Sequence, residues 1–296
     1  MALMRKVFVT GSRGFIGKRL VLALENSGYE VFPLDLLGGG AHQQKIDIVT
    51  HDLKELLNQF KPDAVIHLAA QVDVTASFEN PIRDLEVNGL GTLRLVTSAL
   101  EAGCTNFIYV ASGGAIYDSN SEMPLSETSR ELPVSPYGLT KSIGEGYTRV
   151  LSEKAGAHWT SLALSNCYGP LVDHKRGVIY EFWKSLSEGR APLIFGPNVT
   201  RDFIFVDDVI RAVLAVIERP TDSRINISSG SEISLINLYN KVSKIMNSRL
   251  EPIAYEPKVG DVLRSCLSNS LAKEITEWEP RISLDEGLLL SIPVSH

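Results

Sequence analysis

The stretch KVFVTGSRGFIG, residues 6–17, decides the fold. Its first residues are β-forming and mostly apolar, and its last residues begin a segment with helical apolar spacing, so a strand, a turn and a helix are expected in that order. The turn carries Gly11, Gly14 and Gly17. Glycines at such places allow a tight turn, close approach of the backbone to a pyrophosphate, and close packing of helix on strand. The stretch therefore predicts a dinucleotide site, against the plainer interpretation of a structural turn.

An acidic residue further along the chain supports this interpretation. Asp35 ends the strand predicted over Tyr29–Asp35 and lies 18 residues after Gly17. A carboxylate there accepts hydrogen bonds from an adenosine ribose and repels a 2′-phosphate, which favours NAD over NADP. Arg13 is the opposing signal, since a guanidinium in the turn can pair with a 2′-phosphate. A phosphate-hydrolysing P-loop is disfavoured because Arg19 stands where that motif has Ser or Thr.

Short strand-like runs alternate with longer helical patterns along the chain. The runs are apolar throughout, as expected for parallel strands that helices cover on both faces. Strands are expected over Val7–Thr10, Tyr29–Asp35, Ala64–Ala69, Phe107–Ser112 and Trp159–Ser165, and helices over Phe15–Ser27, Leu53–Phe60, Pro81–Ala102 and Pro136–Ala155. This rhythm predicts an α/β fold: a Rossmann-like doubly wound parallel sheet with a smaller C-terminal substrate-binding lobe. We expect residues 1–165 and 201–230 to form the NAD-binding domain, with 201–218 and 224–228 returning to the main sheet, and residues 166–200 and 231–296 to form the lobe.

Composition and charge exclude several classes of protein. The 296 residues include 35 acidic and 29 basic side chains, a net charge of −6 without a basic run, which argues against nucleic acid as a partner. Cys104, Cys167 and Cys266 lack the spacing of a disulfide framework or a zinc site, so no metal is expected. No apolar run approaches the roughly 20 residues of a membrane span, and no secretion signal precedes the first strand. A cytoplasmic protein without membrane contact is expected.

A tyrosine and a lysine four residues apart form the candidate catalytic pair. Tyr137 and Lys141 belong to YGLTK at the start of a predicted helix, where Ser135 is the expected cap. The spacing places both side chains on one helix face. Because a neighbouring ammonium favours the phenolate, the pKa of Tyr137 is expected to fall toward the range useful for a base. The location of the pair after Ser112, which ends a predicted strand, makes the pattern more specific than the spacing alone.

The order of these motifs resembles the extended short-chain dehydrogenase/reductases, in particular their nucleotide-sugar epimerase/dehydratase branch. The similarity rests on TGSRGFIG at 10–17, Asp35, Asp47-Ile48, HLAA at 67–70, Asn88 with Gly91-Thr92, Ser112 near Tyr117, YGLTK at 137–141, NCYGP at 166–170, RDF at 201–203, Gly260-Asp261 and WEP at 278–280. It covers almost the whole chain.

The resemblance implies roles for the matching residues. Tyr137 would be the acid–base residue, Lys141 would bind the nicotinamide ribose and lower the tyrosine pKa, and Ser112 would hydrogen-bond the reacting sugar oxygen. The implied NAD contacts, with Tyr137 and Lys141, are Gly11, Arg13, Gly14, Phe15, Ile16, Gly17, Asp35, Asp47, Ile48, Leu68, Ala69, Ala70 and Asn88, and the implied substrate contacts are Ser112, Asn166, Arg201 and Arg264. His67 in the same motifs is expected to be a hydrogen-bonded core histidine.

The implied activity is that of an NAD-dependent nucleotide-sugar epimerase, similar to the UDP-sugar 4-epimerases, which acts on a nucleotide-diphosphate sugar by transient oxidation to a keto sugar. Two alternatives of the same family stay open: an NAD(P)H-dependent reductase of nucleotide-4-keto-6-deoxysugars, and a sugar dehydratase, although the Thr-Asp-Glu triplet of 4,6-dehydratases is absent. A non-catalytic NAD-sensing protein is the alternative of another class. The resemblance also implies a homodimer through the helices that contain Asn88 and Tyr137.

Overall fold

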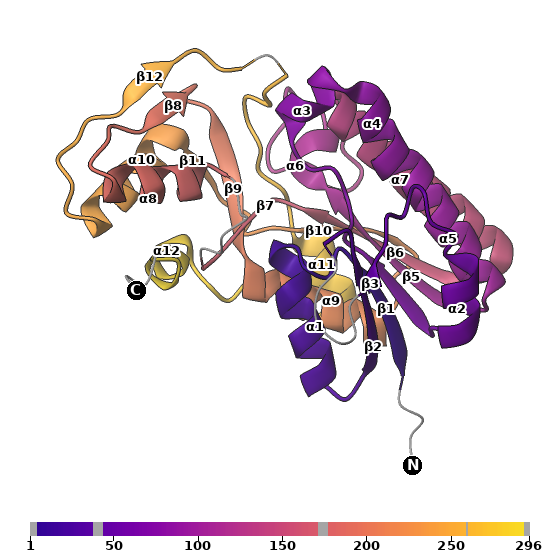
Figure 1. Ribbon diagram of the computed structural model, residues 1–296. Coiled ribbons are helices and arrows are strands. Elements are labelled where there is room, and N and C mark those ends of the chain that lie inside the picture. The colour runs from indigo at the N-terminus through magenta and orange to yellow at the C-terminus, as the bar shows by residue number, and fades with distance from the viewer. Residues whose placement is uncertain (1–4, 38–43, 171–176, 259, 293–296) are drawn as a thin grey trace.

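The computed structural model describes residues 5–37, 44–170, 177–258 and 260–292 (Figure 1). Its main feature is a seven-stranded sheet of parallel strands in the order β10-β6-β5-β4-β1-β2-β3. The strands are β1 (Lys6–Thr10), β2 (Glu30–Asp35), β3 (Gln44–Lys45), β4 (Ala64–His67), β5 (Asn106–Ser112), β6 (His158–Leu164) and β10 (Ser223–Ile227). The order of strands reverses between β1 and β4, and a crevice at such a point is where doubly wound sheets bind nucleotides. The predicted fold class is confirmed.

Helices cover both faces of this sheet, as Figure 1 shows. One face packs against α1 (Phe15–Asn26), α9 (Val206–Glu218) and α11 (Ser270–Thr276), and the other against α2 (Lys54–Phe60), α5 (Thr92–Glu101) and α7 (Pro136–Ala155). Alternate residues of β1 point to the two layers: Val7 and Val9 belong to the first core and Phe8 to the second, all three fully buried. Burial on both faces explains why the strands are apolar throughout.

The predicted helix over Pro81–Ala102 is a continuous helical run in three parts. These are α4 (Pro81–Leu85), a π-helical turn η1 (Glu86–Gly91) and α5. The side chain of Asn80 accepts a hydrogen bond from the Arg83 N–H at 3.0 Å, and Gly103 ends the run at φ +88°, so both predicted boundaries are confirmed. The π-helical turn was not predicted. Single π-helical turns within α-helices occur frequently at functional sites.

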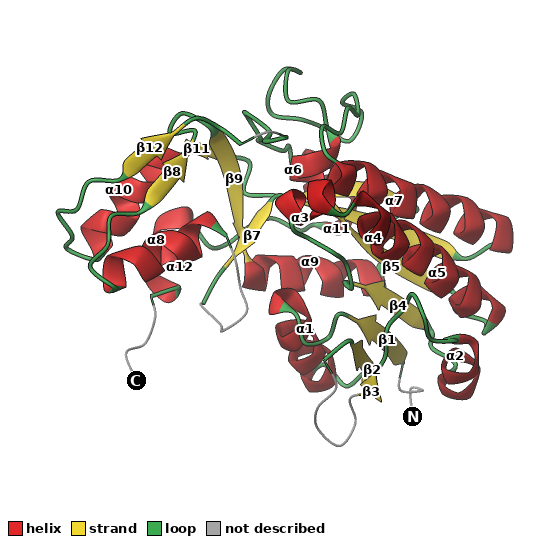
Figure 2. Ribbon diagram, turned by 45° about the horizontal axis from the view of Figure 1, so that its top comes forward, coloured by secondary structure: helices red, strands yellow, loops and turns green. Residues whose placement is uncertain are grey.

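A smaller lobe lies beside the main sheet (Figure 2). It contains a three-stranded sheet of β7 (Asn166–Tyr168), β9 (Thr200–Phe205) and β11 (Glu232–Ser234), a two-stranded sheet of β8 (Leu193–Phe195) and β12 (Ile253–Tyr255), and the helices α8 (Val178–Ser187), α10 (Leu235–Ile245) and α12 (Leu284–Leu290). Two short helices, α3 (Val74–Glu79) and α6 (Gly113–Ile116), lie at the edge of the main unit. The fully buried Phe182 and Trp183 centre the core of the lobe.

One predicted placement is wrong. Residues 201–205 were expected to return to the main sheet, but β9 pairs in parallel with β7 and antiparallel with β11. The chain leaves the main sheet after β6, and β7 then provides β9 with a local partner. The elements that follow do return as predicted, since α9 packs on β5 and β6, and β10 pairs with β6 at the edge of the main sheet.

Candidate active site

The glycine turn after β1 has the geometry of an anion cradle. Gly11 has φ +69°, and a Cβ there would lie 2.7 Å from the backbone nitrogen of Ala69, so a side chain is excluded on both counts. Helix α1 begins after Gly14 with no side-chain cap, which leaves its first N–H groups for an anion. Ser12 Oγ is buried in the turn and has no hydrogen-bond partner among the described residues. The turn therefore fits the pyrophosphate of NAD.

The carboxylate of Asp35 is held at the rim of this turn. One oxygen accepts the Arg13 N–H and the other the Leu37 N–H, both at 2.9 Å. The Arg13 guanidinium donates to the Leu37 carbonyl at 2.6 Å, so it is engaged at the same rim. Phe15 and Ile16, in the first turn of α1, pack against the core of the lobe. The geometry of Asp35 suits a carboxylate that receives ribose hydroxyls.

His67 at the end of β4 is a core histidine, as predicted. Its Nδ1 lies 2.7 Å from Thr10 Oγ1 and its Nε2 lies 2.9 Å from Thr92 Oγ1. Burial, with a smaller contribution from the charge of Lys141, lowers the pKa of His67 to about 3. The loop that follows, with Leu68 and Ala69, closes over Gly11. His67 is thus a neutral residue that fixes β1, β4 and α5 below the crevice.

Ser112, Tyr137 and Lys141 lie where β5, α6 and α7 meet. Ser112 ends β5, and α7 begins with Ser135 as its cap, whose Oγ accepts the Gly138 N–H at 3.1 Å. A Cβ on Gly138 would overlap the Ala115 carbonyl oxygen, so this glycine lets the first turn of α7 lie directly on α6. Ser112 and Tyr137 are close enough for their hydroxyls to hydrogen-bond. Lys141 is only 4% exposed, and its Nζ lies 4.3 Å from the centre of the Tyr109 ring.

Burial dominates the electrostatics of this pair. It raises the pKa of Tyr137, and the hydrogen bond to Ser112 opposes that rise only in part. It lowers the pKa of Lys141 to about 7, against the opposing charges of Glu145 and Asp84. The prediction that the phenol has a lowered pKa is therefore wrong for the protein alone, because desolvation of the phenolate outweighs the stabilisation. Tyr137 is a neutral phenol in this state.

Asn88 lies in η1 and connects the loop after β4 to α7. Its Oδ1 accepts the Gln71 N–H at 2.9 Å, and its Nδ2 donates to the Gln71 carbonyl at 3.0 Å and toward Thr140 Oγ1 at 3.2 Å. It also donates to Asp84. Gln71, Thr140 and Asp84 are not among the predicted site residues. The spacing of Asp84 and Asn88, four residues apart on one helix, is the signal that could have found the carboxylate.

The predicted substrate contacts other than Ser112 lie on or beside the three-stranded sheet of the lobe. Asn166 begins β7, and its Oδ1 is 3.5 Å from the point where a Cβ on Gly114 would be, so it lies beside the segment that follows Ser112. Arg201 on β9 donates to the Thr200 carbonyl at 2.8 Å and also to the Val262 carbonyl, and burial lowers its pKa. Arg264 is half-exposed and forms a salt bridge with Glu232. Both arginines are therefore associated with the segment around Val262, since Arg201 bonds to its carbonyl and Arg264 follows it by two residues.

Asp47 and Ile48 follow β3, the edge strand of the main sheet. The carboxylate of Asp47 accepts the Val49 N–H at 2.9 Å and pairs with Arg83 at 3.2 Å. Ile48 is 3% exposed and packs against Gly91, where a Cβ would lie 2.9 Å from its Cδ1. Their predicted role beside adenine, like that of Ala70 in the loop after β4, stays a prediction.

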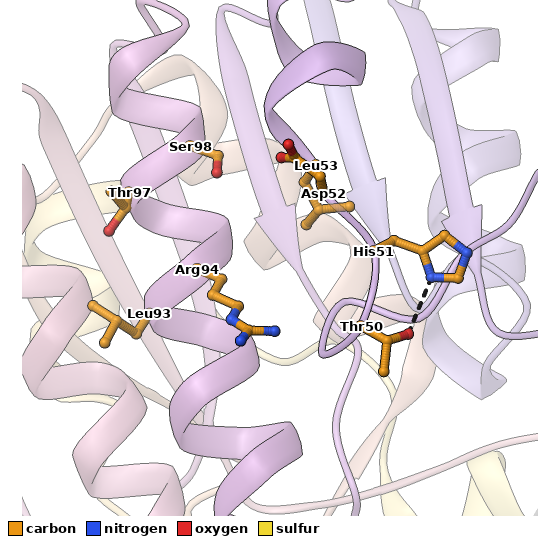
Figure 3. A pocket seen from close by; sticks show the side chains of 8 residues that line it. All are labelled: Thr50, His51, Asp52, Leu53, Leu93, Arg94, Thr97 and Ser98. Carbon is orange, nitrogen blue, oxygen red and sulfur yellow. Dashed lines mark hydrogen bonds between the residues drawn. The ribbon is translucent and has the colours of Figure 1, made fainter.

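A hollow of about 420 Å³ lies elsewhere, between α5 and the segment before α2 (Figure 3). Its lining residues are Thr50, His51, Asp52, Leu53, Leu93, Arg94, Thr97 and Ser98. None of the predicted site residues lines it, so it is a feature distinct from the candidate active site.

Comparison with known proteins decides the family. The sequence profile described as "NAD dependent epimerase/dehydratase family" matches residues 7–228, most of the chain. The chain belongs to this family. This epimerase/dehydratase is 36% identical to the UDP-glucose 4-epimerase of Mycolicibacterium smegmatis, over 97% of each chain. Among solved structures, it resembles the UDP-glucose 4-epimerase of Thermotoga maritima with UDP-glucose at TM-score 0.93 and 34% identity, covering 97% of each chain. It resembles the UDP-glucose 4-epimerase of Thermus thermophilus in complex with NAD at TM-score 0.90 and 30% identity, again over 97% of each chain.

The epimerase/dehydratase family uses NAD, in agreement with the predicted cofactor and with the glycine turn. In the part of the chain that the structure describes, no helix combines the length and the apolar character needed to cross a membrane.

Proposed function

We propose that the protein is an NAD-dependent UDP-sugar 4-epimerase. The observation that carries the proposal is the meeting of Ser112, Tyr137 and Lys141 at the carboxyl end of β5, on the same edge of the sheet as the glycine turn after β1. The full-length similarity to UDP-glucose 4-epimerases supports this substrate class above that of the reductases and dehydratases. NAD, when bound, supplies a reversible hydride acceptor, so an epimerisation needs no net oxidant.

The residues of the chain move the proton. Tyr137 exchanges a proton with the sugar hydroxyl, and Ser112, which hydrogen-bonds the phenol, orients that oxygen. The Lys141 ammonium stabilises the phenolate when it forms, since opposite charges at short range favour both charged forms. Gly11, Gly14 and Gly17 hold the pyrophosphate of NAD, and Asp35 holds the adenosine ribose.

The nucleotide diphosphate of the substrate is assigned to the lobe side. Arg201 and Arg264 supply two guanidiniums near the segment around Val262, and such groups pair well with phosphates. Asn166, beside Gly114, is the polar group between these cations and Ser112. Because Arg264 pairs with Glu232 at an exposed place, exchange of that carboxylate for a phosphate costs little.

The test is a substrate screen on the purified protein. UDP-, GDP-, CDP- and dTDP-sugars are incubated with and without added NAD or NAD(P)H, and products are identified by NMR. Interconversion of a UDP-sugar with its 4-epimer, without added reductant and with NAD retained by the protein, supports the proposal. A product that forms only with stoichiometric NAD(P)H identifies a reductase. Tight NAD binding without turnover of any sugar identifies a sensing protein.

We propose a homodimer through the outer face of α4, α5 and α7. Apolar side chains are exposed there, among them Ile82 at 72%, Leu139 at 53% and Val150 at 49%. Leu85, Pro133 and Leu139 also line a mostly apolar groove of about 480 Å³ on this face. A second copy offers the same apolar face, as a two-fold interface requires. Light scattering should give about twice the 32.5 kDa mass of one chain for the wild type and the mass of one chain for Leu139→Asp.

Two further predictions remain proposals. A cytoplasmic location is supported by the buried Cys104 and Cys266, which are free thiols in the structure. The division into an NAD-binding domain of residues 1–165 and 201–230 and a lobe of residues 166–200 and 231–296 is supported by the separate core of the lobe, with the exception that β9 belongs to the sheet of the lobe.

A further inference from the structure

A fully buried carboxylate lies behind the candidate active site. Asp84 on α4 is 0% exposed. Its Oδ1 accepts hydrogen bonds from Gln71 Nε2 at 2.7 Å and Asn88 Nδ2 at 3.3 Å, and its Oδ2 accepts one from Thr140 Oγ1 at 2.5 Å. All three donors are neutral. In the described part of the chain, no lysine or arginine forms a salt bridge with Asp84, and the adjacent Arg83 turns to Asp47 and Glu86.

Burial of a charge without a cation beside it is costly, so a chain that keeps one usually has a use for it. The other buried acid near the site is different. Glu145, one turn after Lys141 on α7, pairs with Arg224 at 2.6 Å, so this acid has a cation beside it, and its charge also raises the pKa of Lys141, more than that of Asp84 does. Asp84 differs in that no ion pair joins it to a cation of the described residues.

Those surroundings are the two reactive side chains. Helix α4 packs against α7, and Thr140, the donor to Oδ2, stands between Tyr137 and Lys141 in sequence. The ionisable groups around Lys141 are Glu145 and Tyr137 on α7, Asp84 on α4, His67 on β4 and Tyr109 on β5. Of these, His67 and Tyr109 are neutral near pH 7, because burial lowers the pKa of the first and raises that of the second. Asp84 also raises the pKa of Tyr137.

We propose that Asp84 is a positioning residue of the active site, whose carboxylate is a second countercharge, with Glu145, of the buried Lys141 ammonium and whose hydrogen bonds orient Asn88 and the first turn of α7. It touches neither substrate nor cofactor. Its charge favours the ammonium form of Lys141 and the phenol form of Tyr137 between turnovers. Only the assignment of Tyr137 and Lys141 to catalysis rests on the proposed function.

The test separates charge from hydrogen bonding. In Asp84→Asn, the amide oxygen can accept from Gln71 and Asn88 and the amide nitrogen can donate to Thr140 Oγ1, so the geometry persists while the charge is lost. Thr140→Val removes one donor and keeps the charge. Asp207→Asn, at an exposed position of α9, removes a charge on a different helix.

The readout independent of turnover is the reactivity of Lys141 itself. A short pulse of reductive methylation, mapped by mass spectrometry across pH 6–9, modifies only the neutral amine. In Asp84→Asn the titration of Lys141 should shift to lower pH by about one unit, which raises its neutral fraction at pH 6 from about one tenth to about one half and makes modification there about fivefold faster. Thr140→Val and Asp207→Asn should leave the titration within a few tenths of a unit of the wild type.

Activity supplies the second readout. In Asp84→Asn the alkaline limb of the kcat profile should shift to lower pH by the same amount, with KM for the UDP-sugar within about threefold of the wild type. An unshifted Lys141 titration in Asp84→Asn, an equal shift in Thr140→Val, or an Asp84→Asn chain that does not fold would each overturn the proposal. If the wild type epimerises no UDP-sugar but the Lys141 titration shifts as stated, the proposed function fails and the role of Asp84 stands.

Discussion

The packing of α7 on η1 makes a sharp prediction about two glycines of the same helix. A Cβ on Gly144 would lie 2.6 Å from the Tyr109 hydroxyl and 2.7 Å from the Asn88 carbonyl oxygen, whereas a Cβ on Gly146 would meet nothing within 4 Å. Gly→Ala in a helix gains about 1 kcal/mol of stability from propensity alone. At Gly144 the forced shift of the helix costs about 1–3 kcal/mol, as overpacking of cores does.

The two variants should therefore differ in stability by about 1–3 kcal/mol, with Gly146→Ala the more stable. For a chain of this size this is a difference of about 2–6 °C in Tm. Thermal unfolding followed by circular dichroism measures it, with light scattering to check the oligomeric state, since Gly146 lies near the proposed dimer face. Because the shift of α7 moves Tyr137 and Lys141, Gly144→Ala should also lower kcat by tenfold or more, on the order of the effect of an ångström of misplacement. Equal Tm values, or Gly144→Ala as the more stable variant, would refute the close packing.

Three further outcomes follow from the structure. Asp35→Ala should weaken NAD binding by roughly 10- to 100-fold and reduce the preference for NAD over NADP. Titration calorimetry on protein freed of bound NAD measures both affinities, and an unchanged affinity for NAD contradicts the assignment of Asp35 to the ribose. Ser135→Ala removes the cap of α7 and should lower the free energy of urea unfolding by about 0.5–2 kcal/mol; no loss means that the cap is dispensable. The pKa of His67 is about 3 in the fold and 6.5 ordinarily, so between these pH values the unfolded chain binds a proton at His67 and the folded chain does not. The free energy of unfolding is therefore unaffected by His67 above pH 6.5 and falls by about 1.4 kcal/mol per pH unit from there toward pH 3. In His67→Asn the free energy of unfolding should fall less steeply between pH 6 and 4 than in the wild type. An equal slope in the two proteins would show that other groups cause the loss of stability.

The sequence predicts the parts of this fold that depend on local rules. The glycine turn, the apolar strands, the cap at Ser135 and the ends of the helical run over Pro81–Ala102 each follow from backbone preferences of a few neighbouring residues, and the structure confirms them. The π-helical turn was missed because apolar spacing does not distinguish one extra residue in a helical run. The pairing of β9 with β7 was missed because strand partners are set by the path of the chain, not by the composition of the strand.

The electrostatics of the site were the least predictable part. Spacing correctly placed Tyr137 and Lys141 on one helix near Ser112, but the direction of the phenol pKa depends on how much water burial removes, which no motif encodes. The salt bridge of Arg264 with Glu232 joins residues far apart in sequence. Asp84 was not predicted for the same reason, since its hydrogen-bond donors Gln71, Asn88 and Thr140 lie on three separate segments.

The central claim is that Tyr137 transfers the proton of the sugar hydroxyl, and Tyr137→Phe tests it most directly. The variant and a matched control, Tyr147→Phe on the exposed side of α7, are compared for NAD content and for the rate of UDP-sugar interconversion by NMR. We expect Tyr137→Phe to retain NAD and to lose turnover by about 10²–10⁴-fold, the usual contribution of a positioned acid–base group, with the control unchanged. A Tyr137→Phe protein that keeps its NAD and turns over within tenfold of the wild type would contradict the claim.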